Sequence, residues 1–335
     1  MSAPASPVLQ PVRPRSAAWV HTLATGDLDE LAQAQHDWSL RYDQLSRGAF
    51  AGSVAHVQLP GLRLVLEDAN CAVRQRGAIG RGQVGFAMAI NLPGDAYFHG
   101  QRLTRDAMIT GPSDDLDLST PAGARMIAVV ADRALLAALW QSLYQKPLAA
   151  WLDHPLVVQA RPAVADALRA THLSLMARLL ASPPLLDDAR SLHQLRDNLL
   201  AEWIEAIPPR VDLSGLLSVA ARKRVVDRAC AVMLAQPELP PSIPQVCRVI
   251  GASPRKLEYC FRDVLGTTPL QYLRAVRLNG VRRDLKRNAD PALGVQDIAS
   301  RWGFWHMSGL SADYKRQFGE LPSQTLRGVE RVSRR

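Results

Sequence analysis

The residues with the clearest chemical potential follow Ser253, where long polar side chains recur at helical spacing. Ser253 can cap a helix, and Pro254 suits its first turn because a missing N–H costs little there. Leu257, Phe261 and Leu265 repeat at helical spacing and would face a core. The outer face would then carry Arg255, Lys256, Glu258, Tyr259 and Arg262. Such a face can read nucleic-acid bases, since arginine pairs bidentately with guanine and glutamate accepts from the cytosine amine.

The elements that would position these side chains occur twice in the chain. Segments 242–274 and 294–327 can be laid over each other with one inserted residue. Matched pairs include Ile250 and Trp302, Gly251 and Gly303, Leu257 and Leu310, Phe261 and Tyr314, Gly266 and Gly319, and Pro269 and Pro322. Each copy reads as an amphipathic helix, a glycine suited to a left-handed turn, and a second amphipathic helix, which is the pattern of a helix-turn-helix unit.

Two tandem units, a long helix between them and the ending GFWHMSGLSADYKRQFGELPSQTLR resemble the DNA-binding domain of AraC/XylS-type bacterial transcription regulators. The resemblance runs from about Arg222 to the end of the repeat. It implies that the second helix of each unit enters a DNA major groove. The ending is most similar to the ethanolamine-utilisation regulator type, which suggests small amines or related metabolites as effectors.

Residue-wise matching to this family assigns Arg255, Glu258 and Tyr259 to groove-facing positions in the first unit. The competing interpretation is that Arg255 and Glu258 are solvated charges or pair with each other at i, i+3. In the second unit the corresponding residues are Met307, Ser308, Gly309 and Ala312, which lack long side chains. We therefore expect that unit to read thymine methyls and groove shape, or to act mainly as a phosphate clamp.

The segment 269–287 predicts one helix of 19 residues, roughly 28 Å long. This length can place two recognition helices in successive major grooves on one face of the duplex. Candidates for phosphate contact are Lys256, Arg262, Arg274, Arg277, Arg282, Arg283, Lys286, Arg287, Lys315 and Arg316. About half of such cations are expected to be solvated or ion-paired instead. We expect Arg283→Ala to lower the salt dependence of binding by about one phosphate contact.

The charge of the chain is divided unevenly. Residues 221–335 hold 21 Lys+Arg and 10 Asp+Glu, a net of 21 − 10 = +11, whereas residues 1–220 hold 19 and 21, a net of 19 − 21 = −2. A basic domain joined to a near-neutral one is typical of a phosphate-binding module attached to a sensing or assembly module.

The fold class predicted is α+β, with an N-terminal antiparallel β barrel and packed helices followed by an all-α domain. Eight short alternating stretches between residues 48 and 131 indicate an antiparallel barrel or sandwich. In the resembled family this position commonly holds a cupin-like barrel that binds a small-molecule effector. Residues 27–42 predict a helix with Asp27 and Asp29 at its start.

Three further helices are predicted within residues 132–207, at 132–146, 162–181 and 186–207. The apolar stripe of the last helix can pack on its own barrel or against a second subunit. The resulting domains are 1–210 for effector sensing or oligomerisation, 211–221 as a linker, 222–328 for DNA binding and 329–335 as a basic tail.

Enzyme signatures are missing from the sequence. His56 and His99 have no histidine two residues away, so the H-x-H metal cluster of a cupin enzyme is absent and we expect no metal and no cofactor. Neither a nucleophile elbow nor a P-loop occurs. The four cysteines, Cys71, Cys230, Cys247 and Cys260, lack zinc spacing, and Cys247 reads as a packed core residue, with a redox sensor as the alternative.

The leading interpretation is a transcription regulator with double-stranded DNA, RNA polymerase and a small-molecule effector as partners, and a homodimer as a further possibility. A cytoplasmic location is expected, since no stretch is apolar enough to span a membrane and the first twenty residues lack a secretory pattern. The alternatives are a cupin-type enzyme with an appended DNA-binding module, or a constitutive DNA-binding protein whose barrel serves only assembly.

Overall fold

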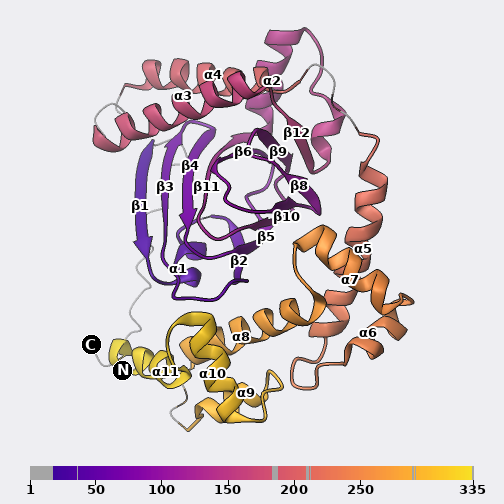
Figure 1. Cartoon of the computed structure of the whole chain (residues 1–335). Coiled ribbons are helices and arrows are strands. Elements are labelled where there is room, and N and C mark those ends of the chain that lie inside the picture. The colour runs from indigo at the N-terminus through magenta and orange to yellow at the C-terminus, as the bar shows by residue number, and fades with distance from the viewer. Residues whose placement is uncertain are drawn as a thin grey trace, which may run out of the picture.

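The computed structural model describes residues 18–35, 37–182, 188–208, 211, 213–288, 290 and 292–333. In the described residues, two antiparallel sheets and the four α-helices α1 to α4 form the first part of the chain, and seven helices form the second (Figure 1). The predicted α+β fold class is confirmed.

The two sheets face each other, and each of their strand pairings is antiparallel. The seven-stranded sheet has the order β1 (Trp19–Thr25), β3 (Gly52–Leu59), β4 (Leu62–Ala69), β11 (Ala124–Asp132), β6 (Gln83–Asn91), β9 (Ala107–Pro112), β12 (Leu156–Gln159). The five-stranded sheet has the order β2 (Ser39–Gln44), β5 (Val73–Ala78), β10 (Leu116–Thr120), β7 (Ala96–Phe98), β8 (Gln101–Leu103). Nine of these strands, β3 to β11, lie within residues 52–132, where eight were predicted between residues 48 and 131.

Helices cover the outer face of the seven-stranded sheet (Figure 1). They are α2 (Arg133–Tyr144), α3 (Pro162–Ala181) and α4 (Ala189–Glu205), with a short 3-10 turn at Ala150–Asp153. The stripe on α4 is buried in this chain's own core, since Leu192 is 4% exposed, Leu199 2% and Trp203 0%. The intramolecular alternative for this stripe is therefore the one that the structure adopts. Helix α3 has the predicted bounds, and residues 186 and 187 of the helix predicted at 186–207 lie outside the described residues.

The helix predicted at residues 27–42 is wrong in its second half. Helix α1 (Leu28–Gln33) begins as expected, because the Asp27 side chain accepts hydrogen bonds from the amides of Asp29 and Glu30. The chain then turns into strand β2. Its residues Tyr42 and Asp43 are both buried although they point to opposite sides, so burial on two faces concealed the strand alternation.

The helical domain consists of α5 (Leu216–Leu234), α6 (Ile243–Ile250), α7 (Pro254–Leu265), α8 (Pro269–Arg287), α9 (Val295–Ser300), α10 (Met307–Phe318) and α11 (Pro322–Ser333). Helix α8 has the predicted bounds. Helix α5 begins at Leu216, within the predicted linker, and α11 continues into the predicted tail. Each helix-turn-helix unit has its own core, one around Leu257 and Phe261 and the other around Leu310 and Tyr314. The four cysteines are buried and unpaired, and Cys247 packs in the first of these cores, as predicted.

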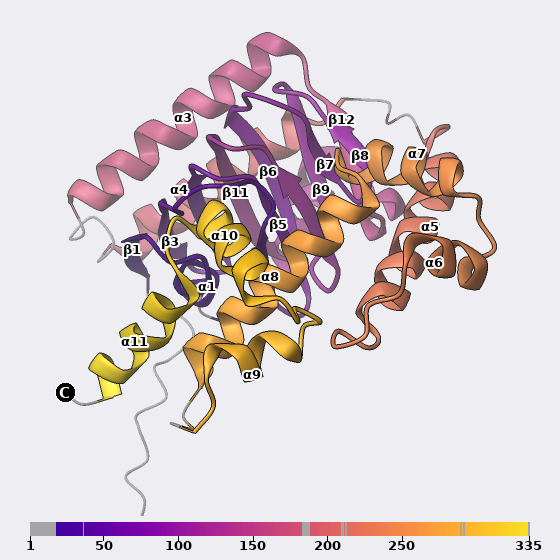
Figure 2. The ribbon, with the colours of Figure 1, turned by 60° about the horizontal axis from the view of Figure 1, so that its bottom comes forward.

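The helical domain docks on the barrel through α8. Figure 2 shows α8 lying across the barrel, with α5 to α7 towards one end and α9 to α11 towards the other. The backbone N–H of Gln44 donates to Oδ1 of Asn279 at 3.0 Å. The side-chain Nε2 of Gln44 donates to the backbone carbonyl of Gln317 at 2.7 Å. Buried polar groups of the two domains therefore satisfy one another.

Candidate nucleic-acid interface

The first unit consists of α6, a glycine turn and α7. Ser242 and Gln245 form a capping box at the start of α6. Gly251 then adopts φ 69°, a left-handed conformation that glycine tolerates without strain. The Ser253 hydroxyl accepts from the amide of Lys256 at 3.2 Å, so the predicted cap of α7 is confirmed.

The outward face of α7 is open to solvent. Tyr259 is 56% exposed, and Arg255 and Glu258 are also exposed. Glu258 forms an ion pair with Arg262 at 3.0 Å, one helical turn on, rather than with Arg255. Among the described residues, Arg255 has no carboxylate within 4.0 Å. The three predicted base-reading side chains of this unit therefore share one accessible face.

The second unit has the same backbone path but a different surface. Gly303 takes φ 70° in its turn, as Gly251 does in the first. On α10, Ser308, Gly309 and Ala312 are exposed, whereas Met307 is partly buried against the core of the unit. The groove-facing candidates of α10 thus offer a shallow surface without long polar side chains.

Cations surround this shallow surface. Asp313 on α10 pairs with Arg274 of α8 and with Arg316, and both arginines are more than half exposed. Lys315 is exposed beside them. These three cations lie where a phosphate backbone could meet them.

The Arg277 side chain is held by contacts within the helical domain. Its guanidinium donates to the carbonyl of Trp302 at 2.5 Å and lies 4.4 Å from the ring centre of Phe304. Burial, reinforced by the charge of Arg274, lowers the pKa of Arg277 to about 10. Arg277 therefore holds the turn of the second unit in place.

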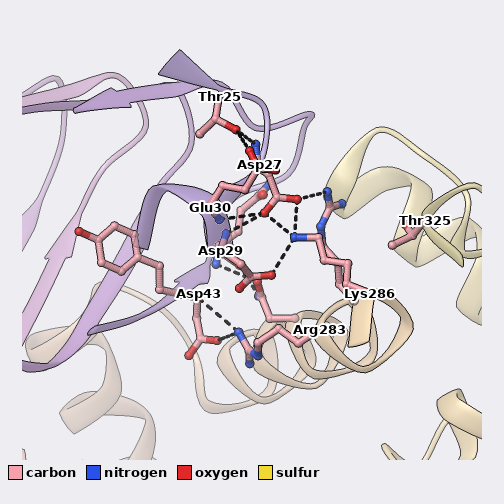
Figure 3. Close-up of polar contacts among 12 residues, drawn as sticks. Thr25, Asp27, Asp29, Glu30, Asp43, Arg283, Lys286 and Thr325 are labelled. Atoms are coloured by element: carbon pink, nitrogen blue, oxygen red, sulfur yellow. Dashed lines mark hydrogen bonds and ion pairs between the residues drawn. The ribbon is translucent and has the colours of Figure 1, made fainter. Parts of the chain in front are cut away.

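Two predicted phosphate cations, Arg283 and Lys286, face the barrel (Figure 3), and Arg282 also lies within 3.8 Å of Asp27. Arg283 pairs with the fully buried Asp43 at 2.9 Å, and Lys286 pairs with Asp29 at 2.8 Å and with Asp27. Arg282 pairs with Glu320 at 2.7 Å and packs over the ring of Phe318. In this conformation Arg282, Arg283 and Lys286 bind carboxylates of the chain itself. The sequence did not indicate these partners.

A second interdomain cluster lies at the other end of α8. Arg74 of strand β5 forms a bidentate pair with Asp117 of strand β10, with both distances 2.8 Å, and donates to the Tyr272 hydroxyl at 2.8 Å. Lys223 of α5 reaches Asp117 at 3.0 Å. Burial alone would raise the pKa of Asp117. The hydrogen bonds and charges of Arg74 and Lys223 outweigh this effect and hold the pKa of Asp117 well below its usual range. The one sequence signal for this cluster is Asp117 between two leucines in a predicted strand.

Comparison with known proteins agrees with this geometry. Residues 246–328 match the helix-turn-helix domain family. The "Probable thc operon regulatory protein" of Rhodococcus erythropolis is 36% identical over 156 residues, which cover 42% of this chain and 44% of that protein. The C-terminal domain belongs to the AraC-type helix-turn-helix family.

Other relatives match shorter stretches of this chain. The "XylDLEGF operon transcriptional activator" of Pseudomonas putida is 35% identical over 86 residues, covering 26% of this chain and 27% of the activator. "Regulatory protein HrpB" of Ralstonia nicotianae is 35% identical over 82 residues, covering 24% of this chain and 17% of that protein. The chain thus spans less than half the length of each of these relatives.

Among solved structures, the AraC-like transcriptional activator CuxR aligns over 84% of this chain and 100% of its own, at 17% identity and a TM-score of 0.36. A transcriptional regulator of Chromobacterium violaceum with an AraC-type DNA-binding domain aligns over 33% of this chain and 96% of its own, at 26% identity and a TM-score of 0.29. Neither overlay is close enough to carry an argument about the barrel. No described helix of the chain is long and apolar enough to cross a bilayer.

Proposed function

We propose that this chain is a sequence-specific DNA-binding transcription regulator that resides in the bacterial cytoplasm with its DNA. The observation that carries the proposal is the pair of accessible recognition faces on α7 and α10 within an AraC-type domain of net charge +11, by the count of residues 221–335. The first unit reads bases through Arg255, Glu258 and Tyr259. The second unit contributes mainly phosphate contacts through Arg274, Lys315 and Arg316.

RNA polymerase is a further partner in this proposal, because the Pseudomonas relative is named a transcriptional activator. A homodimer would need a surface other than the stripe on α4, which is buried within the chain. The suggestion of a small amine as effector came from the sequence resemblance, and its identity stays a prediction.

We also propose that a molecule bound in the barrel controls the AraC-type domain through the five-stranded sheet. Strands β2, β5 and β10 separate a cavity inside the barrel from α5 and α8. Their cavity-facing residues are Leu40, Tyr42, Gln75, Leu116 and Leu118. Their neighbours Asp43, Arg74 and Asp117 bind Arg283, Tyr272 and Lys223 on the far side. Because residues alternate along a strand, a shift of one strand changes both faces at once.

The test is recovery of genomic DNA fragments with the purified full-length chain, followed by titration of the recovered sites at several salt concentrations. We expect a few sites to be bound at least about 1000-fold more tightly than random duplex at physiological salt. The affinity should fall steeply as salt rises, because bound phosphates release counterions. Equal affinity for all duplexes, or binding that salt does not change, would contradict the proposal.

A further inference from the structure

Two of the most exposed aromatic side chains belong to the two helix-turn-helix units. Among the described residues, three large aromatic side chains are exposed, namely Tyr144 (41%), Tyr259 (56%) and Trp305 (61%). Tyr259 lies on α7, and Trp305 lies just before α10, which begins at Met307. An exposed indole keeps a large apolar surface in water, and a partner that covers this surface is favoured.

Trp305 is the extra residue of the second unit. In the first unit Ala252 alone lies between the turn glycine and the cap residue of α7. In the second unit Phe304 and Trp305 lie between the turn glycine and the cap residue of α10. Ala252 and Phe304 both pack against the cores of their units. Since α7 and α10 each have 12 residues, the insertion adds an exposed indole at the entry of α10 and does not lengthen the helix.

The aromatic residues around Trp305 are held by the fold. The Trp302 indole N–H donates to the Asp284 carboxylate at 2.7 Å. The Phe304 ring lies 4.4 Å from the Arg277 guanidinium. For the Trp305 ring, the described part of the chain provides no hydrogen bond, ring contact or cation–π contact. The packing of the second unit therefore does not account for an indole at this position.

Trp305 adjoins the end of α10 that would meet the bases. The first residues of a recognition helix are the ones that contact base edges in the major groove. The exposed face of α10 carries short side chains, so the helix can approach the base pairs closely and bring its entry to the floor of the groove. A polyanion is the partner that the surrounding charge favours, because the unit also exposes Arg301, Lys315 and Arg316.

We infer that Trp305 determines the specificity of the second unit, and that its indole ring contacts the methyl group of one thymine in the major groove. The thymine methyl is the apolar group that base pairs present there, and apolar side chains read it by contact. An indole at the helix entry reaches further than Ser308, Gly309 or Ala312 can. This inference rests on the proposed function, because it names the base that the second unit reads.

The test uses the intact chain and a genomic site that it binds tightly. Each thymine of the site is replaced in turn by deoxyuridine, which lacks the methyl group, and the affinities of wild type and Trp305→Ala are measured. We expect one replacement to weaken wild-type binding about fourfold, as for the loss of one buried methyl group. The same replacement should leave the affinity of Trp305→Ala unchanged. If every replacement affects the two proteins equally, the inference is overturned.

The variants also separate a base contact from a phosphate contact. Trp305→Ala should weaken binding to the intact site by at least about tenfold, as for a central aromatic contact. Its salt slope should equal that of the wild type, because an uncharged side chain releases no counterions. Trp305→Phe keeps an aromatic ring and should keep part of the response to the methyl group. A slope lowered by about one contact, or wild-type affinity in Trp305→Ala, contradicts the assignment.

Tyr144→Ala is the matched control, because it removes an exposed aromatic ring from α2, outside the AraC-type domain. It should leave both the affinity for the site and the response to deoxyuridine unchanged. If the wild type binds its site selectively and Trp305→Ala does so equally well, the role of Trp305 fails while the proposed function stands. If the wild type binds all duplexes alike, the proposed function fails and the role of Trp305 fails with it.

Discussion

The two helix-turn-helix units share one fold but expose different side chains. The first exposes Arg255 and Tyr259 on its second helix, whereas the second exposes Ser308, Gly309 and Ala312 at the corresponding face. Their cores match position by position, since Leu257 and Leu310 are both almost fully buried in them. Matched cores therefore determine the shape of a unit without determining what its outer face can recognise.

The units also differ in how they are attached to the barrel. The first is held near Tyr272 by the buried Arg74–Asp117 pair, and the second by a cation set at the far end of α8 that binds Asp27, Asp29 and Asp43. The first attachment buries a charge pair almost completely, with side-chain exposures of 2% and 7%. Removing one partner of such a pair leaves the other charge without compensation.

The largest expected effect comes from Asp117→Asn, which leaves Arg74 buried beside a neutral amide. We expect the free energy of unfolding to fall by about 3–5 kcal/mol, measured by urea denaturation. Asp227→Asn is the matched control, because Asp227 also pairs with Lys223 but is 46% exposed. It should cost less than about 1 kcal/mol. Equal losses of unfolding free energy in the two variants would show that the buried Arg74–Asp117 pair contributes no more to stability than the exposed pair of Asp227 and Lys223.

Arg255→Ala tests the difference in base reading. We expect it to remove about 1–3 kcal/mol of discrimination at one base position, measured by titration of single-base operator variants. Ser308→Ala changes the corresponding residue of the second unit and should alter discrimination by less than about 0.5 kcal/mol. If Arg255→Ala weakens binding to every sequence alike, Arg255 is a phosphate contact.

Gly309→Ala sharpens the comparison of the two units. A Cβ at Gly309 meets nothing within 4 Å, so this change should stabilise α10 by up to about 1 kcal/mol in thermal unfolding. Gly251→Ala also has open space, yet its φ of 69° should make the same substitution destabilising. A destabilising Gly309→Ala would mean that α10 needs a flexible first turn.

Lys315→Ala probes the phosphate-clamp role of the second unit. We expect the salt slope of binding to fall by about one contact, so that over a fourfold rise in salt the affinity of the variant drops about threefold less than that of the wild type, for all sequences alike. Arg283→Ala is the contrast. Its side chain is 11% exposed and bound to Asp43, so we now expect it to leave the salt slope unchanged and to loosen the domain contact instead. A lowered slope in Arg283→Ala would show that the domains separate on DNA.

Local chemistry made the helical domain predictable. The cap at Ser253, the glycine turns and the bounds of α8 depend on residues close in the sequence, and each was found as expected. Strand β2 escaped prediction because its burial on both sides depends on the sheet and on α8. The partners of Asp117 escaped for a similar reason, since they come from β5 and α5 and meet only where the two domains dock.

The amino-acid sequence by itself determined the duplicated unit, its caps and turns, and the separation of a basic domain from a near-neutral one. These features arise from spacing and composition, which do not depend on distant contacts. Only the tertiary structure decided that Arg283 and Lys286 bind barrel carboxylates and that Asp117 binds Arg74 and Lys223 between the domains. The partners of these charges are brought together by the docking of sheets and helices, and chain spacing carries no information about that docking.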